Sequence, residues 1–148
     1  MAIRRAAAAD VVAVEQIVAA AYAPYVSRIG TRPGPMLDDY AALVADGVVW
    51  VAGAPVCGLV VLLARDGYLL LDNIAVAPAV HGQGVGRALL DFAEERARAG
   101  GFTELRLYTH QKMTENIALY ARSGWQETGR GRQDGFDRVF FRKIVFGA

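Results

Sequence analysis

Cysteine and net charge are both scarce in this sequence, and each shortage excludes a class of protein. Cys57 is the single cysteine among 148 residues, which excludes an internal disulfide framework and a multi-cysteine zinc or iron–sulfur site. The 16 Lys and Arg residues against 15 Asp and Glu residues leave a formal net charge of +1. Such a balance gives no general attraction for polyanions, so nucleic acid is not an expected partner.

Long uninterrupted apolar runs are also missing. The Ala-rich segment after Arg5 is broken by Asp10 and Glu15, and the apolar stretch 47–64 is divided by Gly and Pro. With 54% hydrophobic and 21% charged residues, the chain is not a disordered linker either. We therefore expect a cytoplasmic globular protein with no membrane element, forming one domain over residues 1–148.

Hydrophobic periodicity predicts alternating helices and strands along the chain. The expected elements are a strand at 2–5, a helix at 11–22, a loop at 25–36, a helix at 37–46, strands at 48–52, 56–64 and 68–76, a helix at 84–99, a strand at 104–109, a helix at 116–123, and strands at 125–127 and 138–146. Asp10 is expected to cap the first helix, and Pro24 to end it. Asp66–Gly67 has the composition of a type I′ hairpin turn.

This order predicts an α/β fold with helices on the faces of a mixed sheet. Three consecutive strands joined by short turns form an antiparallel meander. The unit from Leu69 to Thr109 contains a strand, a helix and a second strand, which is typical of a parallel crossover.

The segment from Asp72 to Leu90 contains the most informative motif. A strand runs into a loop with Gly82, Gly84 and Gly86, and this loop opens the longest helix of the second half. Glycines let the backbone approach a ligand closely, and a helix N-terminus offers unpaired N–H groups and a positive dipole end. A phosphate or pyrophosphate group is the expected ligand.

Three phosphate-binding motifs compete for this loop. A dinucleotide motif, Gly-x-Gly-x-x-Gly, needs a third glycine at its sixth position. Arg87 stands at that position if the motif starts at Gly82, and Leu89 stands there if it starts at Gly84. A P-loop needs a Gly-Lys-Ser/Thr tripeptide, which the sequence does not contain. The pyrophosphate loop of an acyl-CoA enzyme remains.

The run His81-Gly82-Gln83-Gly84-Val85-Gly86 after Ile74-Ala75-Val76 resembles the signature of the GCN5-related N-acetyltransferase (GNAT) family. The segment 115–125, with Tyr120, Gly124 and Trp125, is similar to the second landmark of that family. The resemblance implies a mixed, mostly antiparallel sheet of about six to seven strands with helices on both faces. It also implies an acetyl-CoA-dependent transfer of an acetyl group to a primary amine of a small molecule or a peptide.

The resemblance implies a set of acetyl-CoA contacts. These involve backbone pairing with pantetheine, pyrophosphate binding and a contact from the second landmark, at Ala75, Val76, His81, Gly82, Gln83, Gly84, Val85, Gly86, Arg87 and Asn116. Two positions depart from the family pattern. His81 replaces a Gln or Arg, and Met113 stands where an Asn is frequent, so Asn116 is either the pantetheine contact or a helix cap.

Two side chains are candidates for the chemistry. Asp72 is a candidate general base for the acceptor amine, directly or through water, or else a structural acceptor of hydrogen bonds. Tyr120 is a candidate donor to the departing CoA thiolate, or else a core aromatic residue. No metal is expected.

The acceptor amine is expected near the loop between the first two helices and near the strand at 104–109. The candidate acceptor contacts, each of which has packing or surface charge as an alternative role, are Tyr22, Tyr25, Arg28, Tyr108 and His110. A non-catalytic acyl-CoA-binding sensor or scaffold is the alternative function. The family resemblance also admits a homodimer.

Overall fold

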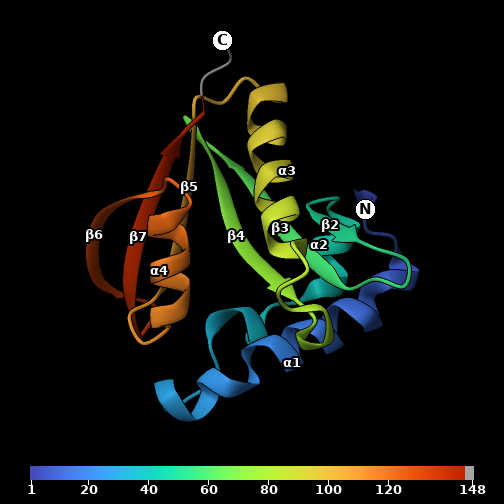
Figure 1. Ribbon diagram of the computed structural model, residues 1–148, viewed down its shortest axis with the longest axis horizontal. Coiled ribbons are helices and arrows are strands. Elements are labelled where there is room, and N and C mark those ends of the chain that lie inside the picture. The colour runs from blue at the N-terminus through green and yellow to red at the C-terminus, as the bar shows by residue number, and fades with distance from the viewer. Residues whose placement is uncertain (146–148) are drawn as a thin grey trace. The chain divides into compact units, whose positions relative to one another are not determined.

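The computed structural model describes residues 1–145, and Figure 1 shows the arrangement of their helices and strands. The elements in chain order are β1 (Ile3–Arg5), η1 (Ala8–Asp10), α1 (Val11–Ile29), η2 (Gly34–Leu37), α2 (Tyr40–Ala45), β2 (Val49–Ala52), β3 (Gly58–Arg65), β4 (Tyr68–Val76), η3 (Pro78–Val80), α3 (Val85–Ala99), β5 (Glu104–His110), α4 (Thr114–Arg122), β6 (Gln126–Gln133) and β7 (Phe136–Ile144). The η elements are short 3-10 helices. The order of the predicted helices and strands is confirmed.

The strands form one seven-stranded sheet in the order β1-β2-β3-β4-β5-β7-β6. β4 and β5 are parallel, with Leu69–Leu71 beside Leu105–Leu107. The pairs β1–β2, β2–β3, β5–β7 and β6–β7 are antiparallel. The predicted mixed, mostly antiparallel sheet is therefore confirmed, together with the parallel crossover through α3.

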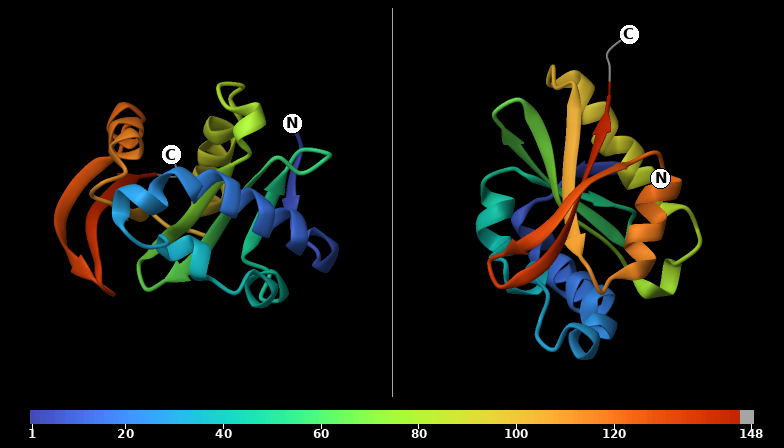
Figure 2. Two further views of the ribbon diagram at one scale, coloured as in Figure 1. Left: turned by 90° about the horizontal axis from the view of Figure 1, so that it is seen from below. Right: turned by 90° about the vertical axis from the view of Figure 1, so that its left-hand side faces the viewer.

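The chain divides into two compact units that share β3, β4 and α3. The first unit comprises Met1–Leu62 and Asn73–Ala93. Its strand β2 is buried throughout, and α1 and α3 lie on opposite sides of β2 and β3 (Figure 2). Helix α1 buries Val14, Ile17, Val18 and Tyr22 along one face. Such a stripe is typical of an amphipathic helix that packs on a sheet.

The second unit comprises Leu63–Asp72 and the chain from Glu94 onward. Its core contains alternate residues of β5 and β7, among them Leu105, Leu107, Val139 and Phe141, which are at most 2% exposed. Alternation of this kind places one face of each strand against the core and turns the other face outward. The description of residues 1–148 as one domain stays a prediction.

Helix α1 extends past Pro24, so the predicted end near Tyr22 is wrong. The helix continues to Ile29 and ends at Gly30, whose φ is +91° and whose N–H donates to the carbonyl of Val26 at 2.9 Å. Proline removes one helical hydrogen bond, but Pro24 is exposed, and Tyr25 and Val26 after it are half-buried. The packing of the following turn thus outweighs the lost bond, and the predicted loop at 25–36 begins later.

Asp10 directly precedes α1, but its side chain does not cap that helix. Its carboxylate accepts hydrogen bonds from the Arg4 guanidinium at 2.7 and 2.9 Å and from the Ala7 N–H at 2.7 Å. An ionised donor makes a stronger hydrogen bond than a neutral amide does. The expectation that the Asp10 side chain caps α1 is therefore wrong. Its hydrogen bonds instead connect β1 to the segment that precedes α1.

The turn with type I′ character lies between β6 and β7 and not between β3 and β4. Such a turn requires positive φ at both central residues. Gly67 has φ +86°, but Asp66 is not among the residues with positive φ, so the expected turn type at Asp66–Gly67 is wrong. Asp134 and Gly135, between β6 and β7, have φ values of +53° and +81°.

Several boundaries also differ from the expectation. Helix α2 begins after Asp39, whose carboxylate accepts from the Ala42 N–H at 3.1 Å, so the predicted start at residue 37 is wrong. Strand β6 extends to Gln133 and β7 begins at Phe136, so most of the segment 128–137 between the two predicted strands is itself strand. Phe146, the predicted end of the last strand, lies outside the described residues.

By length and composition, one helical stretch of the described chain, Ala8–Ile29, is apolar enough to cross a membrane. A core helix of a soluble protein meets the same criterion.

Candidate functional site

The N-terminus of α3 presents a set of unpaired backbone donors. The first helical hydrogen bond runs from the Ala88 N–H to the Gly84 carbonyl at 3.0 Å, so the amides of the preceding turn have no acceptor within the helix. Gly82 and Gly84 have φ values of +79° and +83°, which only glycine adopts readily. The side chains of His81, Gln83 and Arg87 around this turn are exposed. The turn has the donors and the positive dipole end that a pyrophosphate requires.

Gly58 at the start of β3 sets the position of α3, and sequence reasoning did not identify it. A Cβ on this residue would lie 2.9 Å from Val85 Cγ1 and 3.1 Å from Leu89 Cδ1. No side chain larger than hydrogen fits there without displacing the helix. By contrast, a Cβ on Gly86 would meet only Val76 Cγ2, at the ordinary distance of 3.7 Å.

After Asn73, the backbone N–H and C=O groups of successive β4 residues point alternately to the two edges of the strand. The Ala77 N–H donates to the Cys57 carbonyl at 2.8 Å, toward β3. Because successive residues of a strand turn their N–H and C=O groups to opposite edges, Val76 turns its amide away from β3. The Ile74 carbonyl follows this rule and accepts from the Tyr22 hydroxyl at 3.2 Å.

A buried hydrogen-bond network supports this part of β4. The Tyr22 hydroxyl donates to Asn73 Oδ1 at 2.6 Å, and Asn73 Nδ2 donates to the Tyr40 hydroxyl at 2.9 Å. Tyr40 in turn donates to the Pro35 carbonyl at 2.6 Å. Buried polar groups with partners on several segments hold those segments in one arrangement. Tyr22, a candidate acceptor contact, is thus buried and joined to β4.

Two further candidate acceptor residues lie near the end of α1. The Arg28 guanidinium lies 5.0 Å from the centre of the Tyr25 ring. Arg28 is exposed and Tyr25 is half-buried. Both side chains are therefore accessible to a solute, unlike Tyr22.

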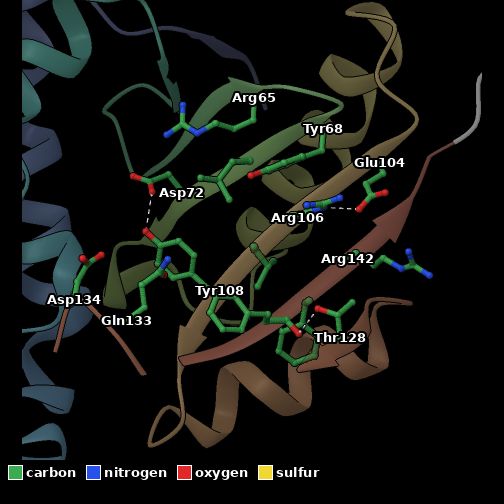
Figure 3. A pocket seen from close by; sticks show the side chains of 14 residues that line it. Arg65, Tyr68, Asp72, Glu104, Arg106, Tyr108, Thr128, Gln133, Asp134 and Arg142 are labelled. Atoms are coloured by element: carbon green, nitrogen blue, oxygen red, sulfur yellow. Dashed lines mark hydrogen bonds and ion pairs between the residues drawn. The ribbon is translucent and has the colours of Figure 1, made fainter. Parts of the chain in front are cut away.

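In the second unit, Asp72 and Tyr108 point toward each other from adjacent strands (Figure 3). The Tyr108 hydroxyl donates to Asp72 Oδ1 at 3.1 Å. On the other side, the Arg138 guanidinium lies 4.1 Å from the centre of the Tyr108 ring. Asp72 and Tyr108 are both half-buried, which leaves them accessible to a small molecule.

A pocket of about 600 Å³ lies on this face of β4, β5 and β7. Its polar lining comes from strands β3 to β7 and from the turn between β6 and β7. The polar lining residues include Arg65, Tyr68, Asp72, Glu104, Arg106, Tyr108, Thr128, Gln133, Asp134 and Arg142 (Figure 3). Arg106 is already engaged, because its Nε donates to Glu104 at 2.6 Å and its guanidinium lies 4.0 Å from the Tyr68 ring centre. The size of the pocket suits a small molecule or a short peptide segment.

His110 lies at the end of β5, opposite Arg138 of β7. It is buried, its Nδ1 accepts from the Lys112 N–H at 3.0 Å, and its ring packs edge-on against Phe136. Burial lowers the pKa of His110. Asp137 opposes this shift, and the cations Lys112, Arg138 and Arg132 add to it. A neutral imidazole at neutral pH is the consequence.

Tyr120 lies on α4 and is 4% exposed. Its ring packs against Trp125 and Phe141, with centre-to-centre distances of 5.9 and 5.7 Å. Asn116 is half-buried in the third position of α4 and therefore is not its cap. The alternative interpretation of Asn116 as a helix cap is wrong.

Tyr120 and Asp72 belong to opposite faces of the sheet in the second unit. Leu71, Leu107 and Phe141 are in register and share one face, which Tyr120 covers through Phe141. Tyr108 and its partner Asp72 follow Leu107 and Leu71 by one residue and lie on the other face. The two side chains therefore contact opposite sides of the sheet.

Residues 1–145 contain no group of three or more His, Cys, Asp or Glu side chains that could hold a metal ion. Sequence reasoning also missed Arg138, although it found the neighbouring strand. In the sequence Arg138 stands in the phase of β7 opposite to the core residues Val139 and Phe141, and only the pairing of β5 and β7 places it beside His110.

Comparisons with known proteins find acetyltransferases among the relatives of this chain. A curated relative, an IAA acetyltransferase of Azospirillum brasilense, is 34% identical over 73 residues, which cover 49% of this chain and 48% of that protein. The rat N-acetyltransferase family 8 member 2 is 34% identical over 93 residues, covering 57% of this chain and 41% of that protein. The matched part spans about half the length of these relatives or less.

The fold has a counterpart of almost equal length among solved structures. PaiA N-acetyltransferase from Thermoplasma acidophilum, solved in complex with coenzyme A, superposes with a TM-score of 0.80 at 17% identity. The superposition covers 97% of this chain and 98% of that protein. This likeness concerns the fold alone.

Residues 45–127, more than half of the chain, match the sequence model of the acetyltransferase (GNAT) domain. This range contains β4, the glycine loop, α3 and Tyr120. The chain therefore belongs to the GNAT acetyltransferase family.

Proposed function

We propose that this protein transfers an acetyl group from acetyl-CoA to a primary amine of a small molecule or a peptide. The observation that carries the proposal is the first turn of α3, where Gly82 and Gly84 have positive φ and no backbone acceptor within residues 1–145 pairs with the amides of Gly82 and of residues 84–87, whereas the Gln83 amide donates to the Val80 carbonyl at 3.2 Å. The acetyltransferases among its relatives and the coenzyme A complex of a structural neighbour support the same cosubstrate.

The amides of residues 82–87 bind the pyrophosphate of acetyl-CoA. Gly82 and Gly84 would meet no atom within 4 Å if they carried a Cβ, so this space is open to a ligand. Arg87 adds a charge-assisted contact from its exposed guanidinium, and His81 and Gln83 flank the loop. In the second unit, Asn116 in the first turn of α4 contributes a polar contact to pantetheine.

Val76 donates its amide to the thioester carbonyl. Its N–H turns away from β3, as the alternation from Ala77 requires, and is the donor that polarises this carbonyl. Removal of one such donor from other enzymes costs about 2.7–4 kcal/mol of transition-state stabilisation. Pantetheine pairs with Ala75 and Val76 in the manner of an additional strand.

Asp72 assists removal of a proton from the acceptor amine. An alkylammonium has a pKa near about 10.4, so at neutral pH the amine must lose a proton before it attacks. The Asp72 carboxylate accepts that proton directly or orients a water that does so, and Tyr108 fixes its position through their hydrogen bond.

Tyr120 donates to the thiolate of departing CoA. Proton transfer from a phenol of pKa about 10 to a thiol of pKa about 8.5 is slightly uphill, so hydrogen-bond donation is its main contribution.

A steady-state assay with a panel of primary amines tests the proposal, with free thiol detected as CoA is released. We expect turnover with at least one amine, a loss of about 10²-fold in kcat for Tyr120→Phe, and unchanged acetyl-CoA affinity in that variant. Tight acetyl-CoA binding with no turnover on any amine would instead support the alternative, a non-catalytic acyl-CoA sensor or scaffold.

A further inference from the structure

Arg138 of β7 is buried without a strong polar partner. Its side chain is 9% exposed, and its buried Nε has no hydrogen-bond partner within residues 1–145. The carboxylate of Asp134 is 4.0 Å from Nη2, beyond hydrogen-bond distance, and its side chain is 80% exposed. A buried guanidinium is usually held by a hydrogen-bonded carboxylate, because an unpaired charge is destabilising away from water.

Two aromatic rings hold the guanidinium in place. Its Cζ lies 4.1 Å from the ring centre of Tyr108 and 5.1 Å from that of Phe136. Ring faces attract a cation and orient its plane, but they accept none of its N–H groups in the way that an oxygen does. The side chain is therefore positioned in advance, and its buried Nε is left without an acceptor among residues 1–145.

The ring of Tyr108 connects this cation to the candidate base. Tyr108 stacks on Arg138 with its face and donates to Asp72 with its hydroxyl. A positive and a negative side chain thus flank one tyrosine on the same face of the sheet. Asp72 and Tyr108 line the pocket, and Arg138 packs on the ring of Tyr108. A ligand with both an ammonium and a carboxylate has the complementary charges.

Resting on the proposed acetyltransferase function, we propose that the acceptor is a primary amine that carries a carboxylate, that is, a free amino acid. The carboxylate binds the Arg138 guanidinium, which offers a fork of parallel donors, and the ammonium lies at Asp72. The exposed Asp134 is held weakly enough to give way to the ligand.

The reaction leaves the carboxylate unchanged. The ammonium loses one proton to Asp72, which passes it to solvent. The nitrogen lone pair forms the C–N bond to the thioester carbon, the C–S bond breaks with its electron pair on sulfur, and the nitrogen loses its second proton, which balances the proton that the thiolate gains. The thiolate then takes up a proton, and the products are an N-acetylamino acid and CoA. No further reactant is required.

Matched acceptors test the assignment. The rate of acetylation is measured for the standard L-amino acids and for their α-carboxamides, which keep the amine and the side chain but lack the anion. We expect kcat/KM of the best amino acid to exceed that of its amide by about ten- to hundredfold, the range for a charge-assisted hydrogen bond. In Arg138→Gln this ratio falls to about one. The control Arg132→Gln, on the 68% exposed Arg132 of the same hairpin, keeps the ratio of the unmodified protein.

The outcomes separate this inference from the proposed function. Amides acetylated as fast as the amino acids, or a ratio unaffected by Arg138→Gln, would overturn the carboxylate assignment while transfer itself stands. Acetyl-CoA binding without transfer to any amino acid overturns it as well. Failure to bind acetyl-CoA contradicts the proposed function. If Arg138→Gln does not fold, Arg138→Lys retains the charge without the planar fork and is expected to raise KM for the amino acid and lower the ratio. An unchanged ratio in that variant would overturn the assignment.

Discussion

The Tyr108 hydroxyl donates a hydrogen bond of 3.1 Å to the Asp72 carboxylate, across the only parallel strand pair that the described sheet contains. Tyr108 comes one residue after Leu107, and Asp72 one residue after Leu71, so the register of β4 and β5 brings the two side chains together. The hydrogen bond fixes the direction of one carboxylate oxygen and leaves the other for a ligand.

We therefore expect Asp72→Asn to lower kcat/KM for the acceptor amine by about 10²-fold, since the amide cannot take up a proton. Tyr108→Phe, which only frees the carboxylate, is expected to cost about tenfold, the lower end of the range for a hydrogen bond to a charged group. Acetyl-CoA affinity, measured by calorimetry, stays unchanged in both variants. Full activity of Asp72→Asn would remove Asp72 from the mechanism.

The glycine loop gives a matched pair of variants. In Gly84→Ala, a Cβ is placed on a residue with φ +83°, which costs about 1–2 kcal/mol of stability and changes the loop. In Gly86→Ala, the new methyl meets Val76 at 3.7 Å within a helix, so stability is kept or slightly raised. Thermal unfolding measures the difference, and equal unfolding temperatures for the two variants would contradict this account of the loop.

Gly58→Ala tests the close approach of α3 to β3. The added methyl lies 2.9 Å from Val85 Cγ1, so α3 must shift or the core must strain. We expect a loss of about 1–3 kcal/mol in unfolding free energy, typical of an overpacked core, and a weaker affinity for acetyl-CoA. Gly67→Ala is a useful control, because its Cβ meets no atom within 4 Å although φ is +86°. It should lose stability without losing acetyl-CoA affinity.

Asp10 predicts a pH dependence of stability. Hydrogen bonds from Arg4 and then from the Ala7 N–H lower the pKa of Asp10 from 3.8 to about 2. A carboxyl with a lowered pKa in the folded state stabilises that state above pH 3.8 and loses this contribution as the pH falls through about 2. Asp10→Asn should therefore reduce the unfolding free energy at neutral pH, with a difference that shrinks toward pH 2. Urea unfolding across this range checks the sign, and a difference that grows in acid would contradict it.

The sequence was sufficient for the order of elements and for the glycine loop because both depend on local chemistry. The strand at 68–76 was predicted to the residue, since β-branched and apolar residues end at Pro78. The loop was recognised from Gly82, Gly84 and the following amphipathic helix.

Other features depend on contacts between distant segments and could not be predicted. Pro24 was expected to stop α1, yet the packing of the next turn keeps the helix intact. Nothing in the sequence distinguishes Gly58 from any other glycine in a strand, because its importance comes from the packing of α3 against it. Arg138 likewise stands near Arg130 and Arg132 in the sequence, but only the pairing of β5 and β7 places it beside Tyr108.

Acetyl-CoA binding is the central claim, and isothermal calorimetry of the purified protein tests it most directly, with NAD and ATP as controls. The account predicts one acetyl-CoA bound per chain at micromolar affinity, no binding of NAD or ATP, and an affinity weakened in Gly84→Ala. No heat of binding with acetyl-CoA in folded protein would contradict the assignment of the loop at residues 82–87 and, with it, the proposed transferase activity.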